Sequence, residues 1–156
     1  MKNLFLLLLC IFIVLGIGFL SGIATMESVN SWYITLIKPS FNPPNYLFGP
    51  AWTILYLLMG ISIYLIIISP ASKEKNKAIL FFCIQLILNF CWSFIFFYFK
   101  LLGIALVEIL ILWIFILLMI IQFKKVKPFS SYLQWPYLIW VTFASILNAS
   151  IFYLNR

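Results

Sequence analysis

The sequence predicts an all-α membrane protein, a bundle of five transmembrane helices with a Pro-rich capping loop between helices 1 and 2. Of its 156 residues, 66% are apolar and only 8% are charged, a composition that water-soluble domains do not show. Five stretches are also long enough to cross a bilayer core of ~30 Å, which takes about 20 residues of helix. These spans are residues 4–24, 46–69, 78–99, 101–123 and 132–154. So little chain lies outside them that residues 1–156 form a single domain.

The first span follows Lys2 and runs through a leucine-rich stretch to about Ala24. A cleavable signal peptide is the alternative, but this apolar run is longer than the 7–15 residues or so of a typical signal h-region. Gly18 and Gly22 form a G-x-x-x-G pattern, which favours close packing against another helix. A second interpretation is that Gly22 leaves room for a ligand.

The segment after the first span is dense in prolines and aromatic residues. Its prolines exclude an ordinary helix from Lys38 to about Gly49, because each lacks an N–H group and restricts the residue before it. The helix-breaking prolines are Pro39, Pro43, Pro44 and Pro50. The aromatic side chains are those of Trp32, Tyr33, Phe41, Tyr46, Phe48 and Trp52. A stiff aromatic loop of this kind is suited to cover a pocket at low entropic cost.

Polar side chains within the third and fifth spans point to contacts inside the bundle, because a polar group in lipid needs a partner. Helical spacing places Gln85, Asn89 and Trp92 on one face of the third span. A second stripe on the fifth span comprises Trp140, Phe143, Ala144, Leu147 and Asn148. Hydrogen bonding between helices is one interpretation of these side chains. For Gln85 and Asn148 it is as well supported as a role in the wall of a cavity. For Asn89 beside Trp92 we favour a cavity wall, since binding sites are mostly apolar with few polar groups.

Glu108 is the one acidic residue within a span. A carboxylate costs roughly 2.5–3.5 kcal/mol at the centre of a membrane helix on insertion scales, so it should face the protein interior or an interface. Pairing with Lys100 near the membrane edge is the favoured interpretation, and a relay role is the alternative.

The lysines and arginines are distributed unevenly between the two sides of the predicted bundle. Seven cations fall on one side, at residues 2, 73, 75, 77, 124, 125 and 127, and three on the other, at residues 38, 100 and 156. The positive-inside bias therefore predicts a cytoplasmic N-terminus, with the first loop and the C-terminus outside. The net charge of +7 is explained by topology and contact with anionic lipid, so no nucleic-acid partner is expected.

Metal binding and histidine-dependent catalysis find no support in the sequence. Histidine is absent, which removes Ser-His-Asp and Cys-His catalysis and the common haem and zinc ligand. Cys10, Cys83 and Cys91 all lie inside predicted spans without metal-ligand spacing. We expect no metal site and no required cofactor, although iron ligation by cysteine or tyrosine stays open.

Five motifs in order resemble the TspO family, the tryptophan-rich sensory proteins that include the mitochondrial translocator protein, or peripheral benzodiazepine receptor. They are W-Y-x-x-L-x-K-P-x-F-x-P-P from Trp32, G-P-x-W-x-x-L-Y from Gly49, Q-L-x-L-N-x-x-W from Gln85, A-L-V-E from Ala105 and P-Y-L-x-W-x-x-F-A-x-x-L-N from Pro136. They touch four of the five spans, and Gly18 to Gly22 adds the first.

The resemblance implies a dimeric five-helix bundle in the bacterial cell membrane, with a pocket for protoporphyrin IX or haem and for isoquinoline carboxamide and benzodiazepine-type ligands. It implies a pocket drawn from Pro44, Phe48, Trp52, Asn89, Phe90, Trp140, Phe143, Ala144 and Leu147. Bacterial members are associated with light-dependent oxidative breakdown of porphyrin, for which Trp52 and Trp140 are the expected redox residues. An indole stacked on an excited porphyrin can exchange an electron. Packing alone is the other interpretation of both tryptophans.

The last helix departs from the mammalian pattern, in which a tyrosine directly follows the Leu-Asn pair. Here Asn148 is followed by Ala149, and only the loose pattern of Leu147, Tyr153 and Arg156 remains. This departure argues against physiological sterol binding.

Three classes of function are compatible with the sequence: a tetrapyrrole-binding sensor or scavenger, a photo-oxidative enzyme and a transporter of porphyrins or other small hydrophobic molecules. The first two would use the same aromatic walls. A transporter would be expected to show internal repeats and broken helices, and neither feature is visible in the sequence.

Overall fold

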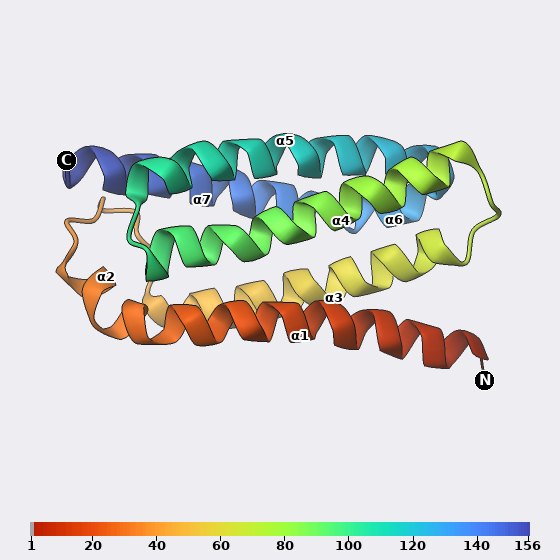
Figure 1. Cartoon of the computed structure of the whole chain (residues 1–156), viewed down its shortest axis with the longest axis horizontal. Coiled ribbons are helices and arrows are strands. Elements are labelled where there is room, and N and C mark those ends of the chain that lie inside the picture. The colour runs from red at the N-terminus through yellow and green to blue at the C-terminus, as the bar shows by residue number, and fades with distance from the viewer. Residues whose placement is uncertain (1) are drawn as a thin grey trace.

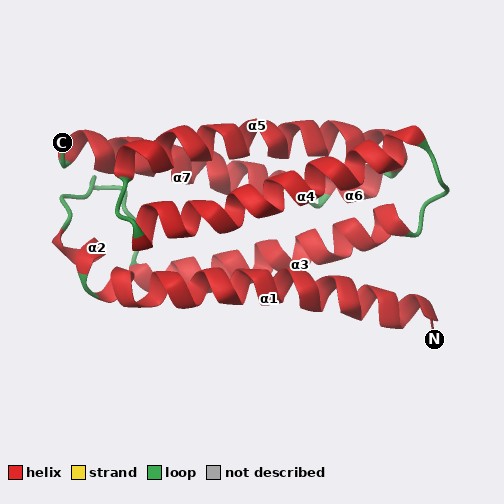
Figure 2. Ribbon diagram, in the orientation of Figure 1, coloured by secondary structure: helices red, strands yellow, loops and turns green. Residues whose placement is uncertain are grey.

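The computed structural model describes residues 2–156, apart from the side chains of Lys2 and Ala24. Lys2 belongs to the cation count, and Ala24 is the predicted end of the first span. The side chains of these two residues lie outside the described part of the chain. The described chain is almost entirely helical, with short connecting loops (Figure 2). The long helices are α1 (Lys2–Asn30), α3 (Phe48–Ile67), α4 (Lys73–Ser93), α5 (Leu102–Val126) and α7 (Trp135–Leu154). Shorter elements are α2 (Trp32–Thr35), η1 (Asn45–Leu47), η2 (Phe94–Tyr98) and α6 (Pro128–Tyr132).

Five helical stretches in the described residues are long and apolar enough to cross a membrane. They are Asn3–Ile23, Asn45–Ile67, Lys73–Tyr98, Leu102–Val126 and Pro128–Leu154. Large apolar side chains also cover the outside of the bundle, as at Phe5 and Phe12, which are 68% and 78% exposed. Such a surface matches lipid and not water, so the protein is an integral membrane protein built as the all-α five-span bundle that the sequence predicts.

The long helices pack along one another as an elongated bundle (Figure 1). Helix α1 packs against α3, and α5 packs against both α4 and α7. The contact between α1 and α3 is close at Gly60, where an added Cβ would lie 2.7 Å from the Cα of Ile11. The fully buried core includes Met59, Ile66, Ile109, Leu112, Ile116, Met119, Phe123, Tyr137 and Val141.

The end of α1 differs from the sequence-based expectation, whereas the start of α3 agrees with it. Helix α1 continues beyond residue 24 to Asn30, because the chain contains no proline or glycine between Gly22 and that residue. No α-helix forms between Lys38 and Leu47, where the last three residues adopt a 3₁₀ turn, and α3 begins at Phe48, so the prediction of no ordinary helix as far as about Gly49 is confirmed to within one residue. Pro50 lies in the first turn of α3, where its missing N–H would have no intrahelical partner.

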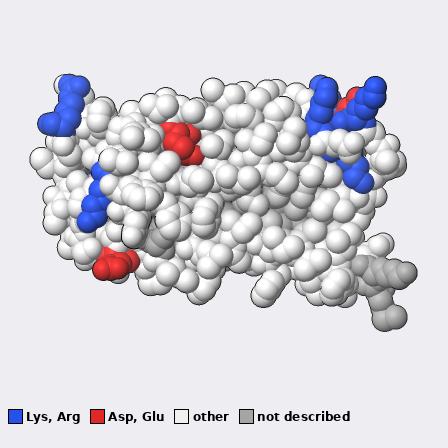
Figure 3. Space-filling view, viewed as in Figure 1, with Lys and Arg blue, Asp and Glu red and all other residues white. Residues whose placement is uncertain are grey.

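The connections gather at two opposite ends of the bundle. The N-terminus and the loop between α3 and α4 share one end, whereas α2, the Pro-rich segment and the C-terminus share the other (Figure 1). The lysines at the start of α4 and the end of α5 form a basic cluster at the N-terminal end (Figure 3). The unequal number of cations at the two ends of the bundle is the feature from which the orientation of the chain in the membrane is predicted.

Candidate ligand cavity

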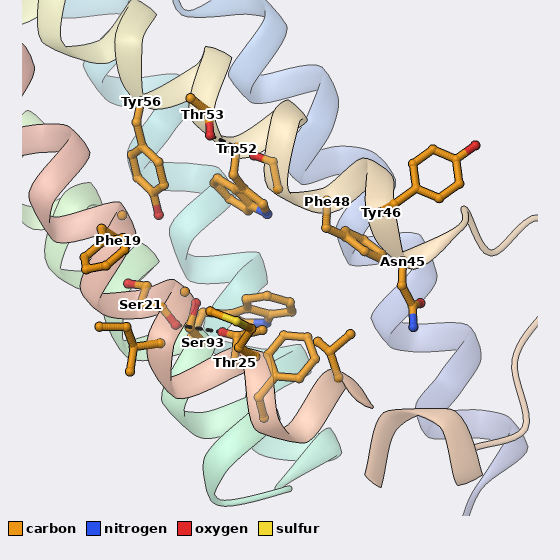
Figure 4. A pocket seen from close by; sticks show the side chains of 18 of the residues that line it. Phe19, Ser21, Thr25, Asn45, Tyr46, Phe48, Trp52, Thr53, Tyr56 and Ser93 are labelled. Carbon is orange, nitrogen blue, oxygen red and sulfur yellow. Dashed lines mark hydrogen bonds between the residues drawn. The ribbon is translucent and has the colours of Figure 1, made fainter. Parts of the chain in front are cut away.

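A cavity of about 870 Å³ lies between α1, α3 and the end of α4. This volume falls within the ~300–1,000 Å³ typical of small-molecule sites. The rings of Trp52 and Phe48 extend from α3 into the space opposite Ser21 and Thr25 of α1 (Figure 4). Residues of α1 that line the cavity are Leu15, Gly18, Phe19, Ser21, Gly22, Ile23, Thr25, Met26, Val29 and Asn30. The other walls are formed by Asn45, Tyr46, Phe48, Gly49, Trp52, Thr53, Tyr56, Trp92, Ser93 and Phe97.

The cavity is largely apolar, and two of its hydroxyl groups are occupied by their own helices. Thr25 Oγ1 donates to the carbonyl of Ser21 at 2.8 Å, and Thr53 Oγ1 donates to the carbonyl of Gly49 at 2.9 Å. Phe19 and Met26 line the cavity and remain 67% and 61% exposed, so other helices of the bundle do not cover this part of the α1 wall.

A buried hydrogen-bond network begins at the cavity and crosses the bundle. Tyr56, which lines the cavity, donates its hydroxyl to Asn89 Oδ1 at 2.6 Å. Asn89 Nδ2 donates to the Tyr137 hydroxyl at 3.0 Å, and that hydroxyl donates to Gln85 Oε1 at 2.9 Å. Because both polar atoms of the Asn89 amide are engaged, this side chain links α3, α4 and α7.

The polar residue of the last span has the same linking role. Trp92 Nε1 donates to Asn148 Oδ1 at 3.3 Å, and Asn148 Nδ2 donates to the carbonyl of Leu102 at 3.1 Å. Gln85 and Asn148 therefore form hydrogen bonds between helices, as one of the two interpretations of these residues predicts. Buried polar groups need such partners in a membrane, because water is absent there.

Trp52 stands at the centre of an aromatic cluster. Its ring stacks on Tyr56, with ring centroids 5.5 Å apart and planes 29° apart. It meets Tyr137 edge-on at 6.2 Å and Trp140 edge-on at 6.5 Å. Aromatic pairs in these arrangements contribute about 0.5–1.5 kcal/mol each beyond area burial, so the position of Trp52 is strongly determined.

A second, much smaller cavity of about 30 Å³ lies on the α7 side of Trp52. Phe48, Trp52, Trp92 and Phe97 line both cavities. The remaining walls of the smaller one are Tyr33, Phe96, Trp140, Phe143, Ala144, Leu147, Asn148 and Ile151. Shared aromatic side chains are thus the partition between the two spaces.

The Pro-rich segment is tied down at both of its sides. Tyr33 is 2% exposed, and its hydroxyl donates to Asn42 Oδ1 at 2.6 Å. Burial raises the pKa of Tyr33 to about 12, so this phenol stays a hydrogen-bond donor at neutral pH. Further along, Ile37 and Asn155 exchange two hydrogen bonds of 2.9 Å, which attach the segment to the C-terminus. These contacts fix the loop beside the start of α3 and the end of α7.

The residues predicted for the site are distributed over both cavities. Gly22, Phe48, Trp52 and Trp92 line the larger one, whereas Trp140, Phe143, Ala144 and Leu147 line the smaller one with Phe48, Trp52 and Trp92. Asn89 lies in the hydrogen-bond network behind Tyr56. Pro44, which precedes η1, and Phe90, which contacts Phe94 at 4.8 Å between ring centroids, line neither cavity.

The α1 wall is the part of the cavity that the sequence reasoning missed. A signal for it was present, since Leu15, Gly18, Gly22 and Val29 recur at steps of three, four and seven along one helical face. Gly22 has nothing within 4 Å of an added Cβ, which agrees with the interpretation that it leaves room. Gly18 packs against Tyr56, as expected for a packing glycine.

Known proteins resemble this chain over nearly its whole length. The TspO/MBR family matches residues 10–154. A tryptophan-rich protein TspO of Chlorobaculum tepidum is 43% identical over 155 residues, which cover 99% of this chain and 98% of that protein. A protein of the same name from Archaeoglobus fulgidus is 42% identical, with 98% and 99% covered, and the human translocator protein is 34% identical, with 80% and 75% covered. With this extent of similarity and five membrane-spanning helices, the chain belongs to the TspO/MBR family.

Proposed function

We propose that this protein binds tetrapyrroles, protoporphyrin IX or haem, inside the membrane, and that the cavity between α1 and α3 is the binding site. The observation that carries the proposal is the volume of about 870 Å³ walled by Phe48, Trp52, Tyr56 and Trp92. A flat, apolar macrocycle is complementary to such walls. At about 0.5–1.5 kcal/mol per aromatic pair in addition to area burial, several rings support micromolar affinity, which corresponds to about −8.2 kcal/mol.

Isoquinoline carboxamides and benzodiazepine-type compounds are the second ligand class of the proposal. They share the flat aromatic character of a porphyrin but are smaller, so they fit the space around Trp52. The side chains on α7 that were expected to contact these ligands, Trp140, Phe143, Ala144 and Leu147, lie behind Trp52 around the smaller cavity. In the proposal they support the back of Trp52, whose ring contacts the ligand from the other side.

The protein requires no resident cofactor in this proposal, and the tetrapyrrole is its ligand or substrate. Because the sequence has no histidine, binding depends on the macrocycle and not on an axial imidazole. Metal-free protoporphyrin should therefore bind about as tightly as haem. Haem binding that is far tighter, with a strong axial-ligand absorption spectrum, would reveal iron ligation by a cysteine or a tyrosine.

The proposed chemistry of the bound porphyrin is light-dependent oxidation, with Trp52 and Trp140 as its redox residues. Trp52 faces the proposed ligand directly, and Trp140 meets its ring edge-on at 6.5 Å. In this scheme the indole of Trp52 gives one electron to the excited porphyrin, which passes it to dioxygen to form superoxide. The electron vacancy, shared between Trp52 and Trp140, is then filled by one electron from the ground-state porphyrin, and superoxide adds to the resulting porphyrin radical cation, so that porphyrin and dioxygen together give an oxygenated product. This activity would serve porphyrin control or stress sensing.

The cellular setting completes the proposal. The lysine-rich end of the bundle faces the cytoplasm together with the N-terminus, and the first loop and the C-terminus face outward. We propose that the protein works as a homodimer in a bacterial cell membrane, as the family resemblance implies. Sterols are not among its proposed ligands.

Titration of the purified protein in lipid nanodiscs with metal-free protoporphyrin IX tests the binding function. We expect saturable, micromolar binding that quenches tryptophan fluorescence, with an isoquinoline carboxamide competing for the site. Binding that rises linearly with porphyrin and equals that of empty nanodiscs would refute the proposal.

A further inference from the structure

Glu108 is a buried acid that the proposed ligand chemistry does not use. It lies on α5 and is 8% exposed, on the same helical face as the fully enclosed Ala105 and Leu112. Neither of its carboxyl oxygens has a hydrogen-bond partner among the described residues. Glu108 follows Leu102 by six residues, which places it about 9 Å along a helix that crosses the membrane.

No cation neutralises this carboxyl group within the described part of the chain. Lys100, the partner expected from the sequence, instead lies over the ring of Trp32 at 5.8 Å, so the predicted interfacial pairing is wrong. Arg156 lies over the ring of Tyr153 at 4.2 Å. The lysines of α4 and α5 are at the opposite end of the bundle.

The titratable groups around Glu108 also offer no positive charge. Helix α5 packs against α4, α7, α6 and η2. Cys91 of α4 and Tyr137 of α7 are close enough to interact electrostatically with Glu108, and both can only be neutral or negative. Tyr98 of η2 and Tyr132 of α6 are 64% and 60% exposed on the outside. An ionised Glu108 would therefore be an uncompensated buried anion, which costs several kcal/mol.

We infer that Glu108 is a proton-binding site within the membrane, a carboxylic acid that carries its proton at neutral pH. This site is independent of the ligand cavity, and the proposed function does not require it. The neutral acid removes the cost of a bare charge between α4, α5 and α7. Loss of the proton would place a negative charge in that interface, so proton release and the packing of α5 are coupled.

Infrared spectroscopy can observe this proton directly. The carbonyl stretch of a protonated carboxylic acid lies above the amide band, whereas a carboxylate has no absorption there. The protein has only three acidic residues, and the other two, Glu27 and Glu74, are exposed and serve as matched controls. The sample is the full chain at neutral pH in a maltoside detergent, which contributes no carbonyl group.

We expect the acid band in the wild type, in Glu27→Gln and in Glu74→Gln, and its loss in Glu108→Gln. A wild type without this band at neutral pH would overturn the inference, as would a band that persists in Glu108→Gln. Since the wild-type spectrum alone can decide against the inference, the test survives a Glu108→Gln variant that fails to fold.

Carbodiimide labelling in liposomes gives a second measurement. The lipid-soluble reagent dicyclohexylcarbodiimide takes up the carboxyl proton on nitrogen, and the carboxyl oxygen bonds to its central carbon. The resulting O-acylisourea rearranges to an N-acylurea without a leaving group. Mass spectrometry should find this adduct on Glu108, while a water-soluble carbodiimide with an amine modifies Glu27 and Glu74. Preferential labelling of Glu108 by the water-soluble reagent would show a hydrated carboxylate and contradict the inference.

Discussion

Gly18 of α1 lies directly against the ring of Tyr56 of α3, so closely that an added Cβ would come within 2.3 Å of two ring carbons. The absence of a side chain at this position allows the Tyr56 ring to occupy the space between the two helices. From there its hydroxyl reaches Asn89 Oδ1 at 2.6 Å. Gly18 thus permits both the close packing of α1 against α3 and the position of the Tyr56 hydroxyl, with which the buried hydrogen-bond network begins.

Replacement of Gly18 by alanine should destabilise the bundle by about 1–3 kcal/mol, because the Tyr56 ring must move and its hydrogen bond to Asn89 lengthens. Gly22→Ala is the matched control on the same helix, since nothing lies within 4 Å of its added Cβ. That control should be neutral or slightly stabilising, because alanine favours helix over glycine by about 0.5–1 kcal/mol. Unfolding in detergent measures both effects, and equal unfolding temperatures for the two variants would contradict this account of Gly18.

Removal of the Tyr56 hydroxyl should cost about 1–3 kcal/mol of stability, because Tyr56→Phe leaves the buried Asn89 carbonyl without its donor. Tyr64→Phe is a suitable control on the same helix, since its hydroxyl has no hydrogen bond among the described residues. Denaturant unfolding compares the two variants. The network would lose its structural importance if Tyr56→Phe were as stable as Tyr64→Phe.

The helices were readily predicted from the sequence, because long apolar runs are required by bilayer thickness itself. Their exact ends were not. Glu27 and Ser28 interrupt the apolar run without breaking a helix, so α1 extends further than hydrophobicity indicates. Pro50 excludes a helix interior but suits a first turn, and only the three-dimensional start of α3 shows which of these applies.

The sequence predicts a candidate site with aromatic walls, but not how the residues of these walls are arranged. Aromatic residues around the Pro-rich segment do surround cavities, yet the sequence could not show that Trp52 separates two of them. Asn89 illustrates the reason. A polar residue on an apolar face needs a partner, and whether that partner is a ligand or a hydroxyl such as that of Tyr56 depends on contacts between residues distant in sequence.

Replacement of both redox candidates should slow the light-dependent loss of bound porphyrin. We expect the Trp52→Phe, Trp140→Phe variant to lower this rate at least about tenfold, equivalent to ~1.4 kcal/mol, because phenyl rings are poorer electron donors than indoles. Porphyrin affinity should change far less, since phenyl rings still stack. Absorbance under illumination is the measurement, with Trp135→Phe as a control because Trp135 lines neither cavity. An unchanged rate in the double variant would exclude tryptophan as the electron donor.

Thiol labelling of intact cells should establish the orientation. A membrane-impermeant maleimide should reach Ser40→Cys in the Pro-rich segment but not Ala71→Cys in the loop before α4. Ala71 is preferable to Ser72, whose hydroxyl accepts the Lys75 N–H and caps α4. The parent protein gives the background of the native cysteines. The reverse labelling pattern would invert the proposed topology.

The central claim, that a tetrapyrrole occupies the cavity between α1 and α3, is tested most directly by filling that cavity from α1. Gly22 and Gly16 both have open space around an added Cβ, but only Gly22 lines the cavity. We predict that Gly22→Leu weakens the binding of metal-free protoporphyrin IX in nanodiscs by at least about tenfold, ~1.4 kcal/mol, and that Gly16→Leu binds like the wild type. Wild-type affinity in Gly22→Leu, with both variants folded, would contradict the account and place the ligand elsewhere.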